Sequence, residues 1–428
     1  MLSRTARFEV RYPMIKVPVL SLTVYILFLS LLSSPISALA NLDVASFEAF
    51  DGFLAPTDQD KVSYYIEQFL AHPETTKELL ERSAIYFPTI EKELYKQGLP
   101  EELKVLPLIE SRCNPQAISY VGAAGLWQFM VPTARQMGLT INSQIDERCD
   151  PQKATEAALA YLQYLHQKYE DWSLVFAAYN AGPTRVNRAI KQAGGDRCFE
   201  AIKAFLPKQT REYIPKYLAA QYVIEHHRQY GIQPDALDLD MQMTSTIRLL
   251  DKMSLSTISK ITGIEKEKVA LLNPSLRKSY VPKVSDGFDL VLPARVAQSL
   301  HLHILGQPQR TIGLRYHTIE LLIEQEISLS AIGEELEIDP YLLKSWNQLT
   351  GKLIPTGTIL TIHEIYSPIN NWIRTYTPLR STVITLDPIP SQRHQMKKEG
   401  VRSIPQTNAL AWQETFNWDL HKMSLVDL

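Results

Sequence analysis

Glu110 is the residue whose setting is best suited to acid–base chemistry. Leu103, Leu106 and Glu110 are spaced three and four residues apart, which places the carboxyl group on the apolar stripe of a predicted helix. Apolar surroundings penalise the charged form of a carboxyl group, so the pKa of Glu110 is expected to rise. A carboxylic acid that stays protonated near neutral pH can donate a proton to a glycosidic oxygen. From this spacing alone, however, a surface glutamate at a helix end is the favoured interpretation.

The stretch that follows Glu110 carries residue types that can hold a sugar. Ser119 comes nine residues after the glutamate, and residues 122–129 then read GAAGLWQF. The glycines allow the backbone to approach a ligand closely. Trp127 and Gln128 offer an apolar face and an amide, which are the usual means of holding a sugar. These residues strengthen the interpretation of Glu110 as an acid in a binding site.

Two later motifs add polar residues to the candidate site. Tyr179 and Asn180 form a polar pair in the stretch AYNAG, where Gly182 is placed to end a predicted helix. Tyr213 follows in the stretch EYIP. Taken by itself, each tyrosine is better explained by core packing with a satisfied hydroxyl group.

The elements that must position these residues are predicted to be helices. Apolar residues recur three and four apart from about residue 58 to residue 230, and strand patterns are nearly absent there. Asp150 and Pro151 supply an N-cap and a first-turn proline for a helix that reaches about Lys168. Further helices are expected over 172–180, from 183 to the glycines at 194 and 195, and over 210–228.

Beyond Gly231 the pattern changes to short strands and helices. Residues 243–293 and 316–362 each show the order strand, helix, helix, strand, which is a weak internal repeat. After about residue 367 few features remain, and the Pro, Gln and Ser content favours a loosely ordered tail. The chain of 428 residues is therefore divided into a leader (1–40), a helical extension (41–98), a helical domain (99–231), two small modules (243–293 and 315–363) and a tail (367–428).

The leader has the order of a secretory signal. Basic residues come first, an uncharged apolar run spans residues 17–32, and small residues surround a cleavage site after Ala40. A retained membrane anchor is the alternative. Export to the periplasm or cell envelope is expected in either case.

The formal net charge is -2 with both signs interspersed, which argues against nucleic acid as a partner.

The cysteines and the remaining acidic residues of the helical domain allow several roles. Cys113 and Cys149 could form a disulfide and leave Cys198 over, and their spacing fits no metal-ligand pattern, so no metal is expected. A hydrolytic enzyme would need a second carboxylate, and the nearby candidates are Asp146, Glu147 and Asp150. We interpret the last as the N-cap of a helix and the other two as residues of its solvated loop.

The ordered motifs resemble those of the lytic murein transglycosylases that carry a soluble-lytic-transglycosylase-type domain. The matching stretches are Glu110-Ser111, Gly125-Leu126-Trp127-Gln128, Ala178-Tyr179-Asn180-Ala181-Gly182 and Tyr213-Ile214-Pro215. The second repeat resembles a LysM module through LSAI at 329–332, Trp346-Asn347 and PTGTILTI at 355–362. The fold class implied is a mainly α, lysozyme-like catalytic domain followed by small β-α-α-β LysM-like modules.

This resemblance implies a specific activity. Glu110 would be the single catalytic acid and base, and Tyr213 would lie close to it. Contacts to the substrate would come from Ser119, Gln128, Tyr179, Asn180 and Tyr213. The enzyme would cleave the β-1,4 bond between N-acetylmuramic acid and N-acetylglucosamine of peptidoglycan without water and without a cofactor, leaving 1,6-anhydro-muramyl ends.

Two alternatives remain open at this point. One is a hydrolytic goose-type lysozyme on the same fold, and the other is a non-catalytic glycan-binding envelope protein. LysM modules bind glycans that contain N-acetylglucosamine. For the first repeat a structural role is favoured over binding. The oligomeric state is left open.

Overall fold

The computed structural model describes residues 53–54, 58–235, 238–307, 314–349 and 351–366. The predicted leader, most of the segment before residue 58 and the predicted tail lie outside these residues. The helical part runs in the order α2 (Gln59–Ala71), α3 (Pro73–Gln97), η3 (Glu101–Val105), α4 (Leu106–Ser111), α5 (Val131–Gln136), η4 (Glu147–Cys149), α6 (Pro151–Tyr169), α7 (Trp172–Ala181), α8 (Pro183–Gln192), α9 (Phe199–Ile202), η5 (Lys203–Phe205), α10 (Lys208–Arg211), α11 (Tyr213–His226), η6 (His227–Tyr230) and α12 (Leu239–Gln242).

Local sequence explains where the central helices begin and end. The Asp150 side chain accepts hydrogen bonds from the backbone N–H groups of residues 152 and 153, so it caps α6 as predicted. Asp171 caps α7 in the same way through the N–H of Leu174. Gly182 ends α7 with a φ of 87°, a conformation that glycine adopts without a steric penalty. The expected helix over 210–228 is divided into α10, α11 and η6.

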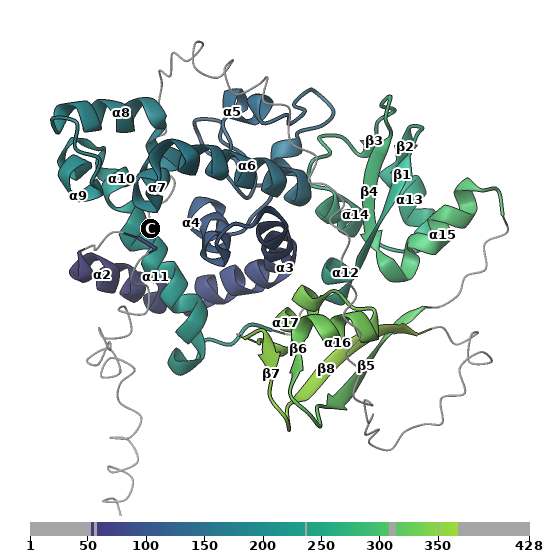
Figure 1. The fold of residues 1–428 in the computed structure, drawn as a ribbon. Helices are drawn as coiled ribbons and strands as arrows, with labels where there is room; N and C mark the ends of the chain where they lie inside the picture. Colours follow the sequence, from purple (N-terminus) through teal and green to yellow (C-terminus); the bar gives the residue numbers. More distant parts are fainter. Residues whose placement is uncertain (1–52, 55–57, 236–237, 308–313, 350, 367–428) are drawn as a thin grey trace, which may run out of the picture. The chain divides into compact units, whose positions relative to one another are not determined.

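The helix α4 lies at the centre of the helical part, with α3, α6 and α11 around it (Figure 1). Helix α11 packs against α2, α4 and α7, and α6 packs against α3 and α7. The face of α6 that meets them carries the predicted apolar stripe of Ala158, Leu159, Leu162 and Leu165, which is buried. Burial of this stripe removes apolar surface from water and stabilises the packing of α6 against α3 and α7.

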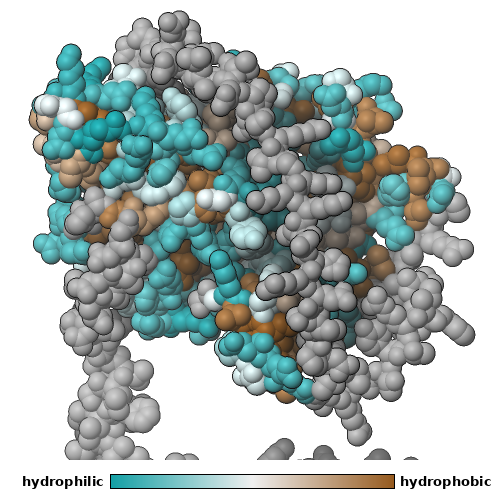
Figure 2. Space-filling view, in the orientation of Figure 1, coloured by the Kyte–Doolittle hydropathy of each residue, from teal (hydrophilic) through white to brown (hydrophobic). Residues whose placement is uncertain are grey.

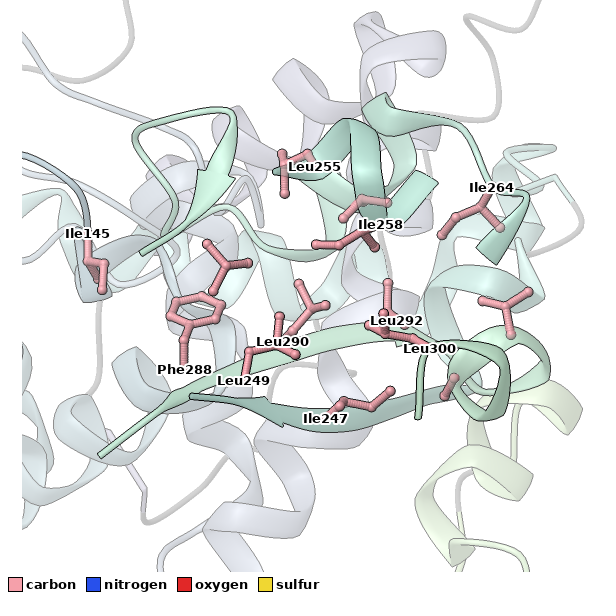
Figure 3. Packing of buried hydrophobic residues seen from close by; sticks show 14 residues of the cluster. Ile145, Ile247, Leu249, Leu255, Ile258, Ile264, Phe288, Leu290, Leu292 and Leu300 are labelled. Atoms are coloured by element: carbon pink, nitrogen blue, oxygen red, sulfur yellow. The ribbon is translucent and has the colours of Figure 1, made fainter. Parts of the chain in front are cut away.

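The first module contains β1 (Thr244–Leu249), β2 (Met253–Ser254), α13 (Leu255–Thr262), α14 (Lys266–Leu272), β3 (Tyr280–Val281) and β4 (Phe288–Pro293). Strands β1 and β4 pair antiparallel, as do the two short strands β2 and β3. Their inward residues and α13 form one apolar core (Figure 3). A further helix, α15 (Ala294–Ile304), adds Val296, Ala297 and Leu300 to this core.

The helix α15 is an addition that the sequence patterns do not predict, since the first repeat is expected to end at residue 293. Its last turn leaves Ile304 and Leu305 exposed. Hydrophobic residues accordingly gather over this helix on the face shown in Figure 2, whereas hydrophilic residues cover much of the helical part.

The second module repeats the strand, helix, helix, strand order. It contains β5 (Arg315–Leu322), β6 (Ile327–Ser328), α16 (Leu329–Leu336), α17 (Pro340–Asn347), β7 (Leu353–Ile354) and β8 (Ile359–Tyr366). Strands β5 and β8 pair antiparallel and close a separate apolar core with α16 and α17. A mainly helical domain followed by small strand-and-helix modules agrees with the predicted fold class.

Cys113 and Cys149 are both buried free thiols, so the disulfide considered above does not form. Burial raises the pKa of Cys113 to about 12, and burial followed by the charge of Asp146 raises the pKa of Cys149 to about 11. Thiols held in their neutral form are poor nucleophiles, so both act as small apolar core residues.

Within the described residues, no helix is both long enough and apolar enough to cross a membrane.

Candidate active site

Glu110 is buried rather than exposed at a helix end. It lies in the last turn of α4 with 9% of its surface accessible, while Leu103 and Leu106 on the same stripe are fully buried. The interpretation as a surface glutamate is therefore wrong. The helix stops directly after it because Arg112 and Cys113 adopt left-handed backbone conformations, with φ of 55° and 53°. This early end leaves the carboxyl group at the boundary between α4 and the loop that follows. The raised pKa stays a prediction.

Tyr213 contacts Glu110 directly. Its hydroxyl group, at the start of α11, donates a hydrogen bond of 2.6 Å to Oε1 of Glu110 across 103 positions of sequence. Burial, and then the negative charge of Glu110 and this hydrogen bond, hold the pKa of Tyr213 well above its ordinary value. The phenol therefore stays protonated at any physiological pH and acts as a permanent donor to the carboxyl group.

Tyr179 lies close to the same carboxyl group. Burial raises its pKa well above the ordinary value, and the charge of Glu110 raises it further, which places the two groups within electrostatic reach. Its hydroxyl group donates a hydrogen bond of 2.8 Å to the backbone carbonyl of Trp127. Tyr179 thereby joins α7 to the loop that contains Trp127, residues 117–129. The neighbouring Asn180 is half-buried, and its Oδ1 accepts a hydrogen bond of 2.8 Å from Thr210 of α10.

The loop that contains residues 117–129 folds back on itself beside α4. Ala124 and Phe129 exchange two backbone hydrogen bonds of 3.1 Å, and the N–H of Gly125 donates to Ala117. The hydroxyl of Ser119 accepts a bond of 2.9 Å from the N–H of Ala123, four residues on. These bonds fix the loop as a closed turn that carries the residues predicted to meet the sugar.

Gln128 forms hydrogen bonds within this loop, and Ser111 connects the loop to α4. Gln128 has a φ of 49°, and its amide donates 2.9 Å to the carbonyl of Gly125. Its Oε1 is buried and has no hydrogen-bond partner among the described residues. Ser111, next to Glu110, donates 2.8 Å to the carbonyl of Leu126. A buried, unpaired acceptor on the loop that Ser111 ties to α4 is suited to receive a donor from a ligand.

Trp127 does not offer its ring to a ligand. The side chain is fully buried, and its indole N–H donates 2.9 Å to Oγ1 of Thr155 on α6. The expectation that it provides an apolar face for a sugar is therefore wrong, because the loop turns the ring inward against α6. Its role is to anchor the loop.

The structure thus brings together Glu110, Tyr213 and Tyr179 from three helices, with the loop of Ser119 and Gln128 adjoining them. The residues that hold these groups in place are not evident from the sequence. Ser111 lies inside one of the ordered motifs, but nothing in its pattern assigns it a role. Thr210 and Arg148 belong to no recognised pattern, because the groups that they hold, Asn180 and the carbonyls of Gly122 and Phe129, are distant in sequence.

Comparisons with known proteins define the class of this chain. Residues 87–201 match the family model of the transglycosylase SLT domain, and residues 243–302 match that of the LysM-like domain of lytic transglycosylase MltD. The chain therefore carries an SLT transglycosylase domain followed by a LysM-like domain, which confirms the family resemblance and the enzyme class predicted from the sequence.

Three individual proteins show how far this similarity extends along the chain. It is 27% identical over 316 residues to membrane-bound lytic murein transglycosylase D of Escherichia coli strain K12, covering 71% of this chain and 69% of that protein. It is 34% identical over 117 residues to the soluble lytic murein transglycosylase of the same strain, covering 26% of this chain and 18% of that protein. The solved structure of the 70 kDa soluble lytic transglycosylase Slt70 from Escherichia coli matches with 27% identity and a TM-score of 0.28, covering 33% of this chain and 24% of that one.

Proposed function

We propose that this protein is a lytic transglycosylase that cleaves the β-1,4 bond between N-acetylmuramic acid and N-acetylglucosamine of peptidoglycan without water. The observation that carries the proposal is the buried Glu110, bonded by Tyr213 at 2.6 Å, within an SLT transglycosylase domain. The named relatives are lytic murein transglycosylases. The residues proposed to contact the glycan are Ser119, Gln128, Tyr179, Asn180 and Tyr213.

One carboxyl group is sufficient for the proposed reaction. Protonated Glu110 donates its proton to the bridging oxygen, the bond from C1 of the muramic acid breaks, and the N-acetylglucosamine leaves with a hydroxyl group. The resulting carboxylate then removes the proton from the 6-hydroxyl group of the same muramic acid. That oxygen bonds to C1 and closes the 1,6-anhydro ring, which returns Glu110 to its protonated form.

The candidate second carboxylates all have structural partners, which favours this reaction over hydrolysis. Asp150 caps α6, as described above. Asp146 is 2% exposed and forms ion pairs with Arg148 and Arg277. The expectation that it lies in a solvated loop is therefore wrong. Glu147 binds the N–H of Thr140 and the ammonium group of Lys153, both at 2.6 Å. A general base for water would need a free carboxylate opposite Glu110.

Product analysis tests the proposed reaction. Purified peptidoglycan digested by the full chain should yield muramic acid ends that lack one water relative to reducing ends, as resolved by liquid chromatography and mass spectrometry. Borohydride treatment, which reduces only free reducing ends, serves as the chemical control. Reducing ends alone would assign the goose-type hydrolytic alternative instead.

Tyr213→Phe is expected to lower kcat by about 10- to 100-fold, because a buried donor to the catalytic carboxyl group is lost. The hydroxyl stabilises the ionised carboxylate, so its removal makes the acid harder to ionise. The loss of activity on the alkaline side should therefore move to higher pH in this variant. A pH profile of strand cleavage measures both effects.

Tyr217→Phe is the matched control for this prediction. Tyr217 is fully buried on the same helix and donates 2.7 Å to the carbonyl of Glu102 rather than to Glu110. Its loss should cost about 1 kcal/mol of unfolding free energy, as for a typical hydrogen bond, and leave kcat nearly unchanged. Equal kcat losses in the two variants would contradict a specific role for Tyr213.

We also infer that the protein acts in the cell envelope, at the periplasmic side or attached to the membrane. The inference rests on the basic and apolar leader and on the murein substrate named for its relatives. Fractionation of cells that express the full chain distinguishes a processed soluble form from a membrane-retained one.

A further inference from the structure

The first LysM-like module shares its core with the helical domain. Ile145 belongs to the loop before α6, yet it is 5% exposed and packs in the apolar cluster of the module. In Figure 3 it lies at the edge of this cluster. Ile145 also pairs with Leu276 in an antiparallel bridge. A residue that completes the core of a module holds that module at a defined position on its neighbour.

Backbone hydrogen bonds on both sides of Ile145 strengthen this junction. The N–H of Asp146 donates 2.8 Å to the carbonyl of Ser275, and the N–H of Arg277 donates 2.9 Å to the carbonyl of Gln144. The loop and the module thus form a short two-stranded ladder, whose geometry is narrowly set by these bonds.

Asp146 receives two guanidinium groups at this junction. Its Oδ2 accepts 2.6 Å from Nη2 of Arg277, on the module, and both its oxygens accept from Arg148, at 2.9 and 2.8 Å. Burial by itself would raise the pKa of Asp146, but the bonds and charges of the two arginines outweigh it and hold the pKa below its ordinary value. The carboxylate is therefore ionised and keeps both partners oriented.

Arg148 carries this arrangement to the loop beside Glu110. Its Nη1 donates 2.6 Å to the carbonyl of Gly122 and 3.0 Å to the carbonyl of Phe129, so it spans both ends of the turn that contains Gln128. The side chain is 5% exposed, which makes its hydrogen bonds costly to break. Arg148 has no other carboxylate partner than Asp146 among the described residues.

We propose that the first LysM-like module acts as a positioning element for the glycan-contacting loop, with Arg277 holding Asp146 and Asp146 holding Arg148 against both ends of residues 122–129. Arg277 is thus a positioning residue, which acts on substrate through the loop and not by touching it. This inference rests on the proposed function of the loop. It also gives the first repeat a structural role that is independent of glycan binding by the module.

A loosened loop should weaken binding more than chemistry. Gln128 lies on the loop, whereas Glu110 and Tyr213 are held by α4 and α11. Arg277→Ala should therefore raise KM about threefold to tenfold, the size expected for one lost partner of a half-exposed, charge-assisted hydrogen bond, and leave kcat within about twofold. Arg277→Lys retains the charge and should restore part of the loss.

The experiment measures turnover of soluble, peptide-free glycan strands by the full chain. The variants are Arg277→Ala, Arg277→Lys and, as a matched control, Arg248→Ala. Arg248 forms a two-point ion pair with Asp289 at 2.8 Å on the same module. Among the described residues, no hydrogen bond or ion pair joins Arg248 to residues 122–129 or to Asp146. The control should behave as the wild type.

A second readout does not depend on catalysis. Hydrogen exchange at the amides of Ala124 and Phe129, which bond to each other, should accelerate in Arg277→Ala and not in Arg248→Ala. Acceleration throughout the helical domain would indicate general destabilisation and would overturn the proposal.

The outcomes separate the inference from the proposed function. An unchanged KM in Arg277→Ala, in an active wild type, overturns the inference. A wild type that produces no anhydro ends instead overturns the proposed function. In that case the wild type and Arg277→Ala are compared by their Kd for the same glycan strands. An equal Kd in the two proteins overturns the inference as well.

Discussion

Glu110→Gln should lower the rate of glycan strand cleavage by about 1,000-fold or more, because both proton transfers pass through this one carboxyl group. Glutamine has nearly the same shape, and its Oε1 can still accept the hydrogen bond from Tyr213. The release of soluble muropeptides from purified peptidoglycan measures the loss.

The stability of this variant should hardly change. The substitution removes a buried ionisable group without leaving a cavity, so the melting temperature should stay within about 3 °C of that of the wild type. Glu93→Gln is the matched control, since Glu93 is another buried glutamate, bonded to Gln97 at 2.7 Å on α3. It should remain active. Cleavage by Glu110→Gln at the wild-type rate would remove Glu110 from its assigned role.

Gly125→Ala is expected to be the most destabilising small substitution in the candidate site. A β-carbon at this position would lie 1.7 Å from the carbonyl oxygen of Arg148, and the residue has a φ of +82°. The obstacle is backbone, which a side-chain rotation cannot relieve. The overlap and the unfavourable φ together should cost about 3 kcal/mol or more of unfolding free energy. Urea denaturation followed by circular dichroism measures this loss.

Gly122→Ala separates the two causes. Gly122 has nearly the same φ, +86°, but a β-carbon at this position would meet nothing within 4 Å. Only the unfavourable φ applies there, so the loss should be about 1–2 kcal/mol. Equal losses at the two glycines would show that the loop moves freely away from Arg148, which would also weaken the positioning role proposed for that arginine.

Local patterns were sufficient for much of the fold. The cap at Asp150 and the spacing of apolar residues on α6 depend on neighbours within one or two turns, and both appear as predicted. The order of strands and helices in the two modules is likewise a matter of short-range periodicity. The helix α15 was not predicted because the first repeat was expected to end at Pro293, although Pro293 directly precedes the helix and Gly306 follows it.

Contacts between residues distant in sequence could not be predicted from local patterns. Trp127 was expected to offer an apolar face to a sugar because it lies beside Gln128 in the glycine-containing stretch 122–129, but its partner Thr155 lies 28 positions away. Asp146 appeared to be a solvated loop residue because its partner Arg277 lies 131 positions away. Neither contact leaves a periodic trace in the sequence, since periodicity reports only which face of an element is buried.

Glu110 shows which features of the site follow from the sequence and which depend on the tertiary structure. Its position on an apolar stripe, and the ordered motifs behind it, follow from the amino-acid sequence, because helical geometry relates residues three and four apart. Only the tertiary structure decided that the stripe is interior, that Tyr213 reaches the carboxyl group across 103 positions, and that Arg277 of the first module bonds to Asp146 before α6. These facts depend on how separate elements pack, and packing is settled by the whole core at once.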